Sequence, residues 1–258
     1  MPAPAAALDP LVRWAAQEPG GASRVFIRGD AVAVAAPGLS GRDRLVVAGP
    51  AADAVPLVRV VLPRIGPGFR PFGDRALLRA VVAEVPGLAP VADFGWMQTD
   101  RPPDGPAEGA AWLTAADADE TSALLDEAFP ASYAYPGRCG PGERWAGVRT
   151  GGRLAAVAAL AWCAPDVAFL AGVATAPSAR GLGLGRTACA FLLREALADR
   201  PLAALVVDDA NTPALRLYRA LGLAYRPLAA AAQRAEPRSA SSAPPETIRE
   251  TSSTRSSR

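Results

Sequence analysis

A run of glycines between a strand pattern and a helix pattern is the feature that most restricts how this chain can fold. The apolar residues 166–175 predict a buried strand, and residues 187–198 carry apolar side chains at helical spacing. Between them stands Arg180-Gly-Leu-Gly-Leu-Gly-Arg186, with glycine at every second position. Glycine lets backbone amides turn toward a ligand, and a helix N-terminus carries about half a positive charge. The stretch therefore predicts a strand–loop–helix unit that binds a phosphate or diphosphate.

Two common phosphate-binding motifs do not fit this loop. The Walker loop needs a lysine, and all 27 basic residues of the chain are arginine. The dinucleotide fingerprint needs a third glycine three positions after the second, where Arg186 stands. The pattern Pro177-x-x-Arg180-Gly-x-Gly-x-Gly185 instead resembles the acyl-CoA loop of the GNAT superfamily of N-acetyltransferases. A glycine-rich turn without a ligand is the alternative at this point.

A second stretch supports the same resemblance. Thr212 as a cap, Pro213 in the first turn and Gly222 at the end predict a helix after a strand at 203–207. Within it, the order Asn-x-x-Ala-x-x-x-Tyr-x-x-Leu-Gly, from Asn211 through Tyr218, resembles the last catalytic helix of the superfamily. A capping asparagine or a core tyrosine alone would be ordinary. Two motifs in this order, one helix and one strand apart, favour the family over about residues 110–230.

The resemblance implies a fold class and a domain division. We expect an α/β (α+β) fold, a GNAT-like mixed, mostly antiparallel twisted sheet flanked by helices, in residues 110–232. The proline- and glycine-rich residues 100–109 predict a linker, and residues 233–258, rich in Ser, Pro, Arg and Thr, predict a disordered tail. Residues 1–99 predict a smaller, degenerate GNAT-like half that lacks the glycine loop and covers one side of the acceptor cleft. An unrelated small α/β domain is an equally weighted alternative for residues 1–99.

Hydrophobic periodicity gives the individual elements. Strands are predicted at 24–28, 31–36, 44–48, 89–97, 111–114, 144–149, 153–162, 166–175, 203–207 and 223–232. Helices are predicted at 5–17, at 51–62 with an interruption at Pro56, and at 74–84, 117–129, 187–198 and 212–222. In residues 1–99 the predicted order is therefore hairpin, strand, helix, helix, strand, which parallels the second half.

The resemblance also implies site residues. The thioester and pantetheine of acetyl-CoA would lie along Val173, Ala174 and Thr175, with a backbone N–H near Val173 for the oxyanion. Tyr218 would be the general acid that protonates the departing thiolate, and Asn211 would orient the cofactor or a water. The diphosphate would be held by the loop residues Arg180, Gly181, Leu182, Gly183, Leu184, Gly185 and Arg186. Tyr133 and Tyr135 fall in a loop that would border the acceptor pocket, although simple packing is favoured for each.

The general base stays unassigned. The interior of the predicted strand before the glycine loop has no acidic residue. The carboxylates of Asp166, Glu143, Asp208 and Asp209, or a water relay to a backbone carbonyl, all remain open.

Composition removes several other classes of function. The chain has no histidine, which excludes His-based triads, His metal ligands and His general bases, and we expect no metal site. A net charge of +2 argues against a nucleic acid or membrane-surface partner. Three cysteines without CxxC spacing fit a reducing cytoplasm, and Cys189 is expected to be a small buried residue. We expect no membrane span and no signal peptide, and a homodimer stays open.

The sequence therefore predicts an acetyl-CoA-dependent N-acyltransferase. It would transfer an acetyl group to a primary amine of a small molecule or peptide by direct attack in a ternary complex. Two alternatives remain: a non-catalytic module that binds or senses acyl-CoA, and a nucleotide-dependent oxidoreductase suggested by the strand, glycine loop, helix, strand and Asp208 in sequence.

Overall fold

The computed structural model describes residues 8–17, 22–104 and 107–234, and these form one continuous eleven-stranded sheet. Its strands lie in the order β1-β2-β3-β4-β11-β5-β10-β9-β8-β7-β6. The strands are β1 Arg24–Arg28, β2 Ala31–Ala36, β3 Arg44–Ala48, β4 Arg70–Asp74, β5 Leu88–Thr99, β6 Ala110–Trp112, β7 Arg144–Thr150, β8 Arg153–Leu160, β9 Val167–Thr175, β10 Leu202–Asp208 and β11 Ala224–Gln233. The helices are α1 Pro10–Ala16, α2 Ala51–Ile65, α3 Arg75–Glu84, α4 Ala118–Ala128, α5 Leu184–Asp199 and α6 Thr212–Ala220.

The sheet is mixed and mostly antiparallel, which confirms the predicted fold class. Only β3 with β4 and β9 with β10 pair in parallel, and one helix links each of these pairs, α2 and α5 respectively. The two halves of the chain repeat this order. β1-β2-β3-α2-β4-α3-β5 in the first half corresponds to β7-β8-β9-α5-β10-α6-β11 in the second. A doubly wound, mainly parallel sheet, which the oxidoreductase alternative requires, is not what these residues form.

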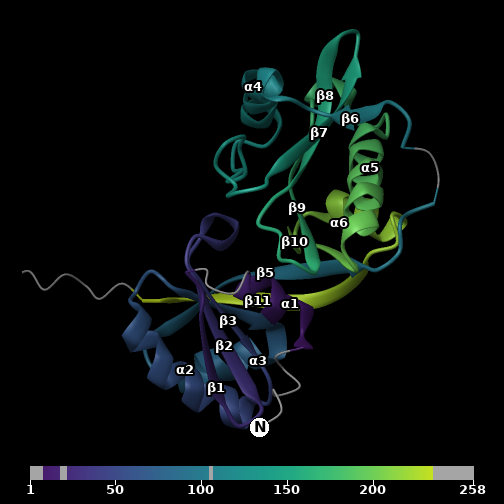
Figure 1. Cartoon of the computed structure of the whole chain (residues 1–258). Helices are drawn as coiled ribbons and strands as arrows, with labels where there is room; N and C mark the ends of the chain where they lie inside the picture. Colours follow the sequence, from purple (N-terminus) through teal and green to yellow (C-terminus); the bar gives the residue numbers. More distant parts are fainter. Residues whose placement is uncertain (1–7, 18–21, 105–106, 235–258) are drawn as a thin grey trace, which may run out of the picture.

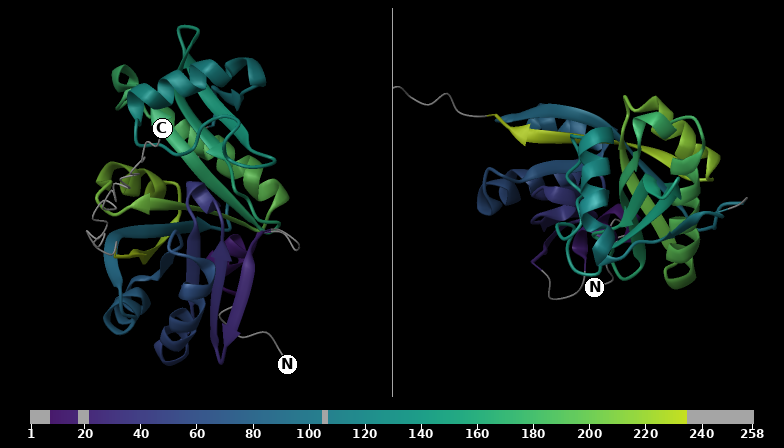
Figure 2. Two further views of the ribbon diagram at one scale, coloured as in Figure 1. Left: turned by 90° about the vertical axis from the view of Figure 1, so that its left-hand side faces the viewer. Right: turned by 90° about the horizontal axis from the view of Figure 1, so that it is seen from above.

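Each half contributes its last strand to the other half. β5 lies between β10 and β11, and β11 lies between β4 and β5. Figures 1 and 2 show the consequence: the purple and blue N-terminal half and the green C-terminal half lie at opposite ends of the sheet, and yellow β11 runs from α6 into the N-terminal end. β5 and β11 pair along their length, from Ala224 opposite Gln98 to Gln233 opposite Leu88.

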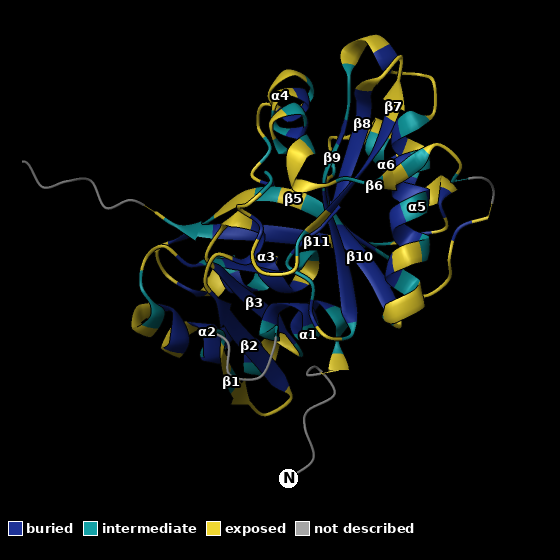
Figure 3. Cartoon of the chain, turned by 45° about the horizontal axis from the view of Figure 1, so that its top comes forward, coloured by how far each residue is buried: buried dark blue, intermediate teal, exposed yellow. Residues whose placement is uncertain are grey.

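The hydrophobic core also crosses from one half to the other. Trp14 of α1 is fully buried, stacks on Phe169 of β9 at 4.3 Å between ring centroids, and contacts Trp96 of β5. Its Nε1 donates a hydrogen bond to the Trp162 carbonyl oxygen at 2.9 Å. Figure 3 shows that the central strands are buried while exposed residues gather on turns and outer helix faces. The core is therefore continuous across the two halves, and separating the halves would expose core side chains.

Several predicted elements are corrected by the structure. β4 was not predicted, so the true order of the first half is hairpin, strand, helix, strand, helix, strand. The predicted interruption at Pro56 is wrong, because α2 continues to Ile65 through Pro56 and Pro63. Asn211, not Thr212, caps α6: its side chain accepts the Ala214 N–H at 3.2 Å. The predicted helix 5–17 is described only from Pro10 to Ala16, and the predicted tail lies almost wholly outside the described residues.

Burial explains why α2 tolerates two prolines. A proline inside a helix costs about 3 kcal/mol because a backbone hydrogen bond is lost and its ring clashes with the preceding turn. Leu57, Val58 and Val61 are buried against the first half of the sheet. Burying a side chain of this size contributes about 1.5–3 kcal/mol, so the apolar face of α2 offsets the cost.

Candidate active site

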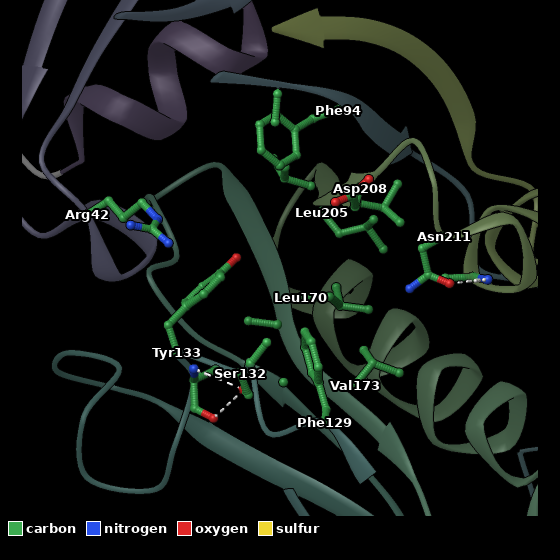
Figure 4. A pocket seen from close by; sticks show the side chains of 18 of the residues that line it. Arg42, Phe94, Phe129, Ser132, Tyr133, Leu170, Val173, Leu205, Asp208 and Asn211 are labelled. Atoms are coloured by element: carbon green, nitrogen blue, oxygen red, sulfur yellow. Dashed lines mark hydrogen bonds between the residues drawn. The ribbon is translucent and has the colours of Figure 1, made fainter. Parts of the chain in front are cut away.

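A cavity opens where β9 and β10 separate. These strands pair only from Val167 to Phe169 and from Leu202 to Ala204, and the residues beyond them diverge. The resulting cavity has a volume of about 720 Å³ and is lined by the diverging segments 170–173 and 205–208. Figure 4 shows Leu170, Val173 and Leu205 in its middle, Arg42 and Tyr133 on one side and Asn211 on the other. The cavity therefore lies between the strands and is lined by residues from both faces of the sheet, such as Phe94 on one face and Tyr218 on the other.

A β-bulge shapes one wall of this cavity. Val157 pairs with Ala174 and Ala159 with Ala171, so β9 holds one residue more than β8 across this interval. Gly172 lies at the bulge with φ +59°, and a Cβ there would come within 2.5 Å of Trp145. A bulge leaves its extra residue without a ladder partner. Gly172 and Val173 line the cavity, whereas Ala174 is buried and Thr175 is half-buried at the strand end.

The glycine loop forms an open N-terminus for α5. Gly181 and Gly183 have φ of +80° and +79°, Leu182 is 66% exposed, and no side chain would meet a Cβ at either glycine. The first turn of α5 contains no acidic residue, so its amides have no internal carboxylate partner. Gly185 is buried, and a Cβ there would lie 2.7 Å from Thr175 Oγ1, so glycine lets α5 pack closely on the end of β9.

The two arginines of the loop differ. The Arg180 guanidinium donates to the Ala128 carbonyl oxygen at 3.3 Å, which ties the loop to the end of α4. Arg186 is exposed at the start of α5. Leu184 begins the helix and is half-buried.

Helix α6 supplies the other predicted polar groups of the site. Tyr218 is 7% exposed and lines the cavity, and its hydroxyl makes no hydrogen bond within the described part of the chain. Burial raises the pKa of Tyr218 well above its usual value of 10, and the nearby Cys189 and Tyr133 add to this. Asn211 lines the cavity as well, with its side-chain oxygen engaged in capping α6. The structure thus brings Val173, Asn211 and Tyr218 to one cavity.

Among the four carboxylates considered as bases, Asp208 alone lines the cavity. Asp166 is paired with Arg13 at 3.0 Å, and Asp209 is paired with Arg75 and accepts a hydrogen bond from the Tyr225 hydroxyl at 2.7 Å. Glu143 accepts the backbone N–H groups of Gly137 and Cys139. Asp208 uses Oδ1 to accept the Ala210 N–H at 2.8 Å, which leaves Oδ2 for other partners.

The opposite side of the cavity is lined from both halves of the chain. Tyr133 and Phe129 come from the loop after α4, and Tyr133 accepts a hydrogen bond from the buried Ser40 hydroxyl at 3.1 Å. Tyr135 lies elsewhere and donates to Asp126. Three arginines of the N-terminal half, Arg42, Arg44 and Arg70, also line this side. The sequence does not indicate these arginines or the bulge at Gly172, because nothing in the pattern marks three arginines among 27.

The buried position predicted for Cys189 is confirmed. Cys189 is fully buried in α5, and burial raises the pKa of its thiol to about 12, so it is packed and unreactive. None of the helices in the described ranges is long and apolar enough to cross a membrane. In the same ranges, no three Cys, Asp or Glu side chains gather as metal ligands.

Comparison with known proteins gives a family match for the second half and the same fold over both halves. The model of the acetyltransferase (GNAT) family matches residues 110–223. A GCN5-related N-acetyltransferase from Kribbella flavida is similar at 23% identity and a TM-score of 0.60, over 90% of this chain and 94% of that one. A GNAT-family protein from Novosphingobium aromaticivorans DSM 12444 is similar at 22% identity and a TM-score of 0.57, over 88% and 97%. Both likenesses extend over the two halves. No curated protein matches the chain.

Proposed function

The chain belongs to the GNAT superfamily of acetyltransferases through residues 110–223, and we propose that it transfers an acetyl group from acetyl-CoA to a primary amine of a small molecule or peptide. The observation that carries this proposal is the cavity between the separated β9 and β10, which is lined by Tyr218 and Val173 and by residues from both faces of the sheet. A donor can enter such a cavity from one face and an acceptor from the other. The two substrates then meet in a ternary complex, and no covalent acyl-enzyme is needed.

On the donor side, we propose that the glycine loop binds coenzyme A. The amides of residues 181–186 and the N-terminus of α5 offer hydrogen bonds and a positive field to the diphosphate. Arg180 and Arg186 supply positive charge at the two ends of the loop. Pantetheine then runs along residues 173–175, and Asn211 faces it from α6 or holds a water there.

The chemistry follows from the groups around the thioester. The amine nitrogen attacks the thioester carbonyl carbon, and the carbonyl oxygen gains negative charge. A backbone N–H at the bulge near Val173 stabilises that oxyanion. As the C–S bond breaks, Tyr218 donates its proton to the sulfur. A thiol has an ordinary pKa near 8.5, and the raised pKa of Tyr218 keeps the donor protonated at neutral pH.

Asp208 is the base that we propose for the amine proton. It is the carboxylate on the cavity wall, and its Oδ2 is not used by the turn that Oδ1 stabilises. It takes the proton either directly or through one water.

For the N-terminal half, we propose a degenerate copy of the GNAT unit in residues 1–99, joined by the linker 100–109 to the catalytic unit 110–232. The repeated element order and the parallel pair β3 and β4 support this. Its connection from β3 to α2 reads Gly49-Pro-Ala-Ala-Asp53, without the glycine loop, and α2 begins directly at Ala51. This half has therefore lost its own diphosphate site and lines the acceptor side of the cavity.

Release of free thiol from acetyl-CoA over a panel of amines tests the proposed function. We expect thiol release that depends on the amine, with the acetylated amine identified by mass. The absence of an acidic residue inside β9 favours one alternative, a module that binds acyl-CoA without transfer. Micromolar acetyl-CoA binding by calorimetry, with no product from any amine, would replace the transferase by that module.

A further inference from the structure

Three arginines from the N-terminal half gather at the acceptor side of the cavity. Arg44 begins β3, Arg70 begins β4, and the two lie opposite each other in the parallel register. Arg42 precedes Arg44 by two residues and is exposed, and all three line the cavity. Figure 4 shows Arg42 beside Tyr133, across the cavity from Asn211. The cluster is thus separated from the donor side by the gap between β9 and β10.

Arg44 is buried without a counter-charge. Its side chain is 6% exposed, its Nε donates to the Leu39 carbonyl oxygen at 3.1 Å, and its guanidinium lies over the Phe72 ring at 4.6 Å. Its two terminal nitrogens have no acceptor within the described residues. Burial lowers the pKa of Arg44 from 12.5 to about 10; Tyr133 opposes this shift, and the charges of Arg42 and Arg70 add to it. A desolvated cation that two like charges repel is unfavourable unless an anion joins it.

Among the described residues, Arg44 is the one buried arginine, and it lacks a carboxylate partner. Several half-buried arginines elsewhere are paired: Arg13 with Asp166, Arg75 with Asp209, and Arg226 with both oxygens of Asp9. None of Arg42, Arg44 and Arg70 forms an ion pair with a described residue. Packing on Phe72 alone would be served by an apolar side chain at position 44, without the cost of burying a charge.

We propose that Arg42, Arg44 and Arg70 bind an anionic group of the acceptor, a carboxylate or a phosphate, so that the acceptor class is amines that carry such a group. This rests on the proposed function and adds the substrate class to it. Guanidinium groups bind both anions in a two-pronged geometry, and the low polarity around Arg44 strengthens the contact. With its anionic end held here, an amino acid or an aminoalkyl phosphate directs its amine toward the gap between β9 and β10. Polyamines and other cationic acceptors are repelled.

The test compares matched acceptors that differ in the anionic group alone. The panel pairs each free L-amino acid with its carboxamide, and O-phosphoethanolamine with ethanolamine. We expect kcat/KM for thiol release to be about 10- to 100-fold higher for at least one anionic member than for its neutral partner, as for one charge-assisted contact. The amino acid and phosphate arms identify which anion is preferred.

Variants connect that preference to the cluster. Arg44→Gln should lower kcat/KM for the preferred anionic acceptor by about 10- to 100-fold, mainly through KM, and bring it close to that of the neutral partner. Arg42→Gln, at an exposed position, tests the same contact if Arg44→Gln does not fold. Arg28→Gln on exposed β1 is the matched control and should keep the preference. The Kd for acetyl-CoA should stay within twofold in all three variants.

Three results would overturn the inference. One is turnover of neutral or cationic amines in preference to their anionic counterparts. A second is an equal loss on both members of a pair in Arg42→Gln. The third is weaker acetyl-CoA binding in Arg44→Gln, which would assign the cluster to the donor.

Failure of the proposed function is detected separately. If no amine yields thiol, the same pairs are titrated calorimetrically against the complex with acetyl-CoA. Binding of the free acid or the phosphate, with its neutral partner at least tenfold weaker, supports the anion site although transfer fails. Equal binding within each pair overturns it.

Discussion

At the residue scale, Tyr218 has a hydroxyl with no protein partner in the described structure, in a buried side chain that lines the cavity. Tyr218→Phe should therefore lower kcat by about 100-fold or more, with Tm and the Kd for acetyl-CoA nearly unchanged. Since burial raises the pKa of Tyr218, the protonated donor persists as pH rises, and this residue should cause no alkaline fall in kcat below about pH 10. Tyr135→Phe, at a tyrosine outside the cavity, is the control. A Tyr218→Phe enzyme with full kcat would remove the assigned acid.

The same scale gives a prediction for the base. Asp208→Asn keeps an oxygen for the Ala210 N–H, so the turn after β10 should survive. The variant cannot take a proton from the amine, and we expect kcat at pH 7 to fall by about 100-fold. Steady-state kinetics with circular dichroism as the folding check measures this. An unchanged kcat would indicate that a water relay, and not Asp208, takes the proton from the amine.

At the scale of single elements, the bulge in β9 depends on Gly172. Gly172→Ala introduces a left-handed residue, at about 1–2 kcal/mol, and a contact with Trp145 that costs about 1–3 kcal/mol more. Gly151→Ala has a similar φ of +58° with nothing near the added Cβ, so it should show only the first cost. Urea unfolding measures both variants. Equal destabilisation would show that the strand relaxes around Trp145.

The glycine loop gives a second prediction at this scale. Leu182 is 66% exposed, so a substitution there should disturb little packing. Leu182→Asp puts a negative charge beside the proposed diphosphate site, and we expect about a tenfold rise in Kd for acetyl-CoA with unchanged Tm. Val60→Asp on α2, also exposed, is the control. Calorimetry that finds equal Kd values would place the diphosphate elsewhere.

At the scale of the whole molecule, the exchanged strands make the two halves interdependent. A fragment of residues 107–234 lacks β5, which pairs with both β10 and β11, and would expose Trp96 contacts such as Phe169. We expect it to be unfolded or aggregated alone, and to give a dispersed amide NMR spectrum when it is co-expressed with residues 8–104. A folded, monomeric fragment 107–234 would contradict this.

The features that the sequence predicts are those that depend on residues close together in the chain. The open loop before α5 and the helix from Asn211 to Tyr218 depend on residues close together in the chain, and their elements lie where periodicity predicts them. β4 was missed because Pro71 and Gly73 argue against a central strand. The structure accepts Gly73 because a Cβ there would lie 2.3 Å from the Val47 carbonyl oxygen.

Two other features depend on distant residues. The strands predicted at 89–97 and 223–232 say nothing of their neighbours in the sheet, so the exchange of β5 and β11 could not be predicted. Arg44 and Arg70 are far apart in the chain, and only the parallel pairing of β3 and β4 makes them a cluster.

The exchanged strands β5 and β11 also limit how a bulky acceptor could enter the cavity. Moving the two ends of the sheet apart as rigid bodies would break the pairing between β5 and β11, so the cavity cannot widen in that way. The contact that can change is the one between the loops of Ser40 and Tyr133, which the buried Ser40 hydroxyl joins by a hydrogen bond to Tyr133. If the proposed function holds, the size of acceptor that fits depends on this pair of side chains, and engineering for larger acceptors should begin there.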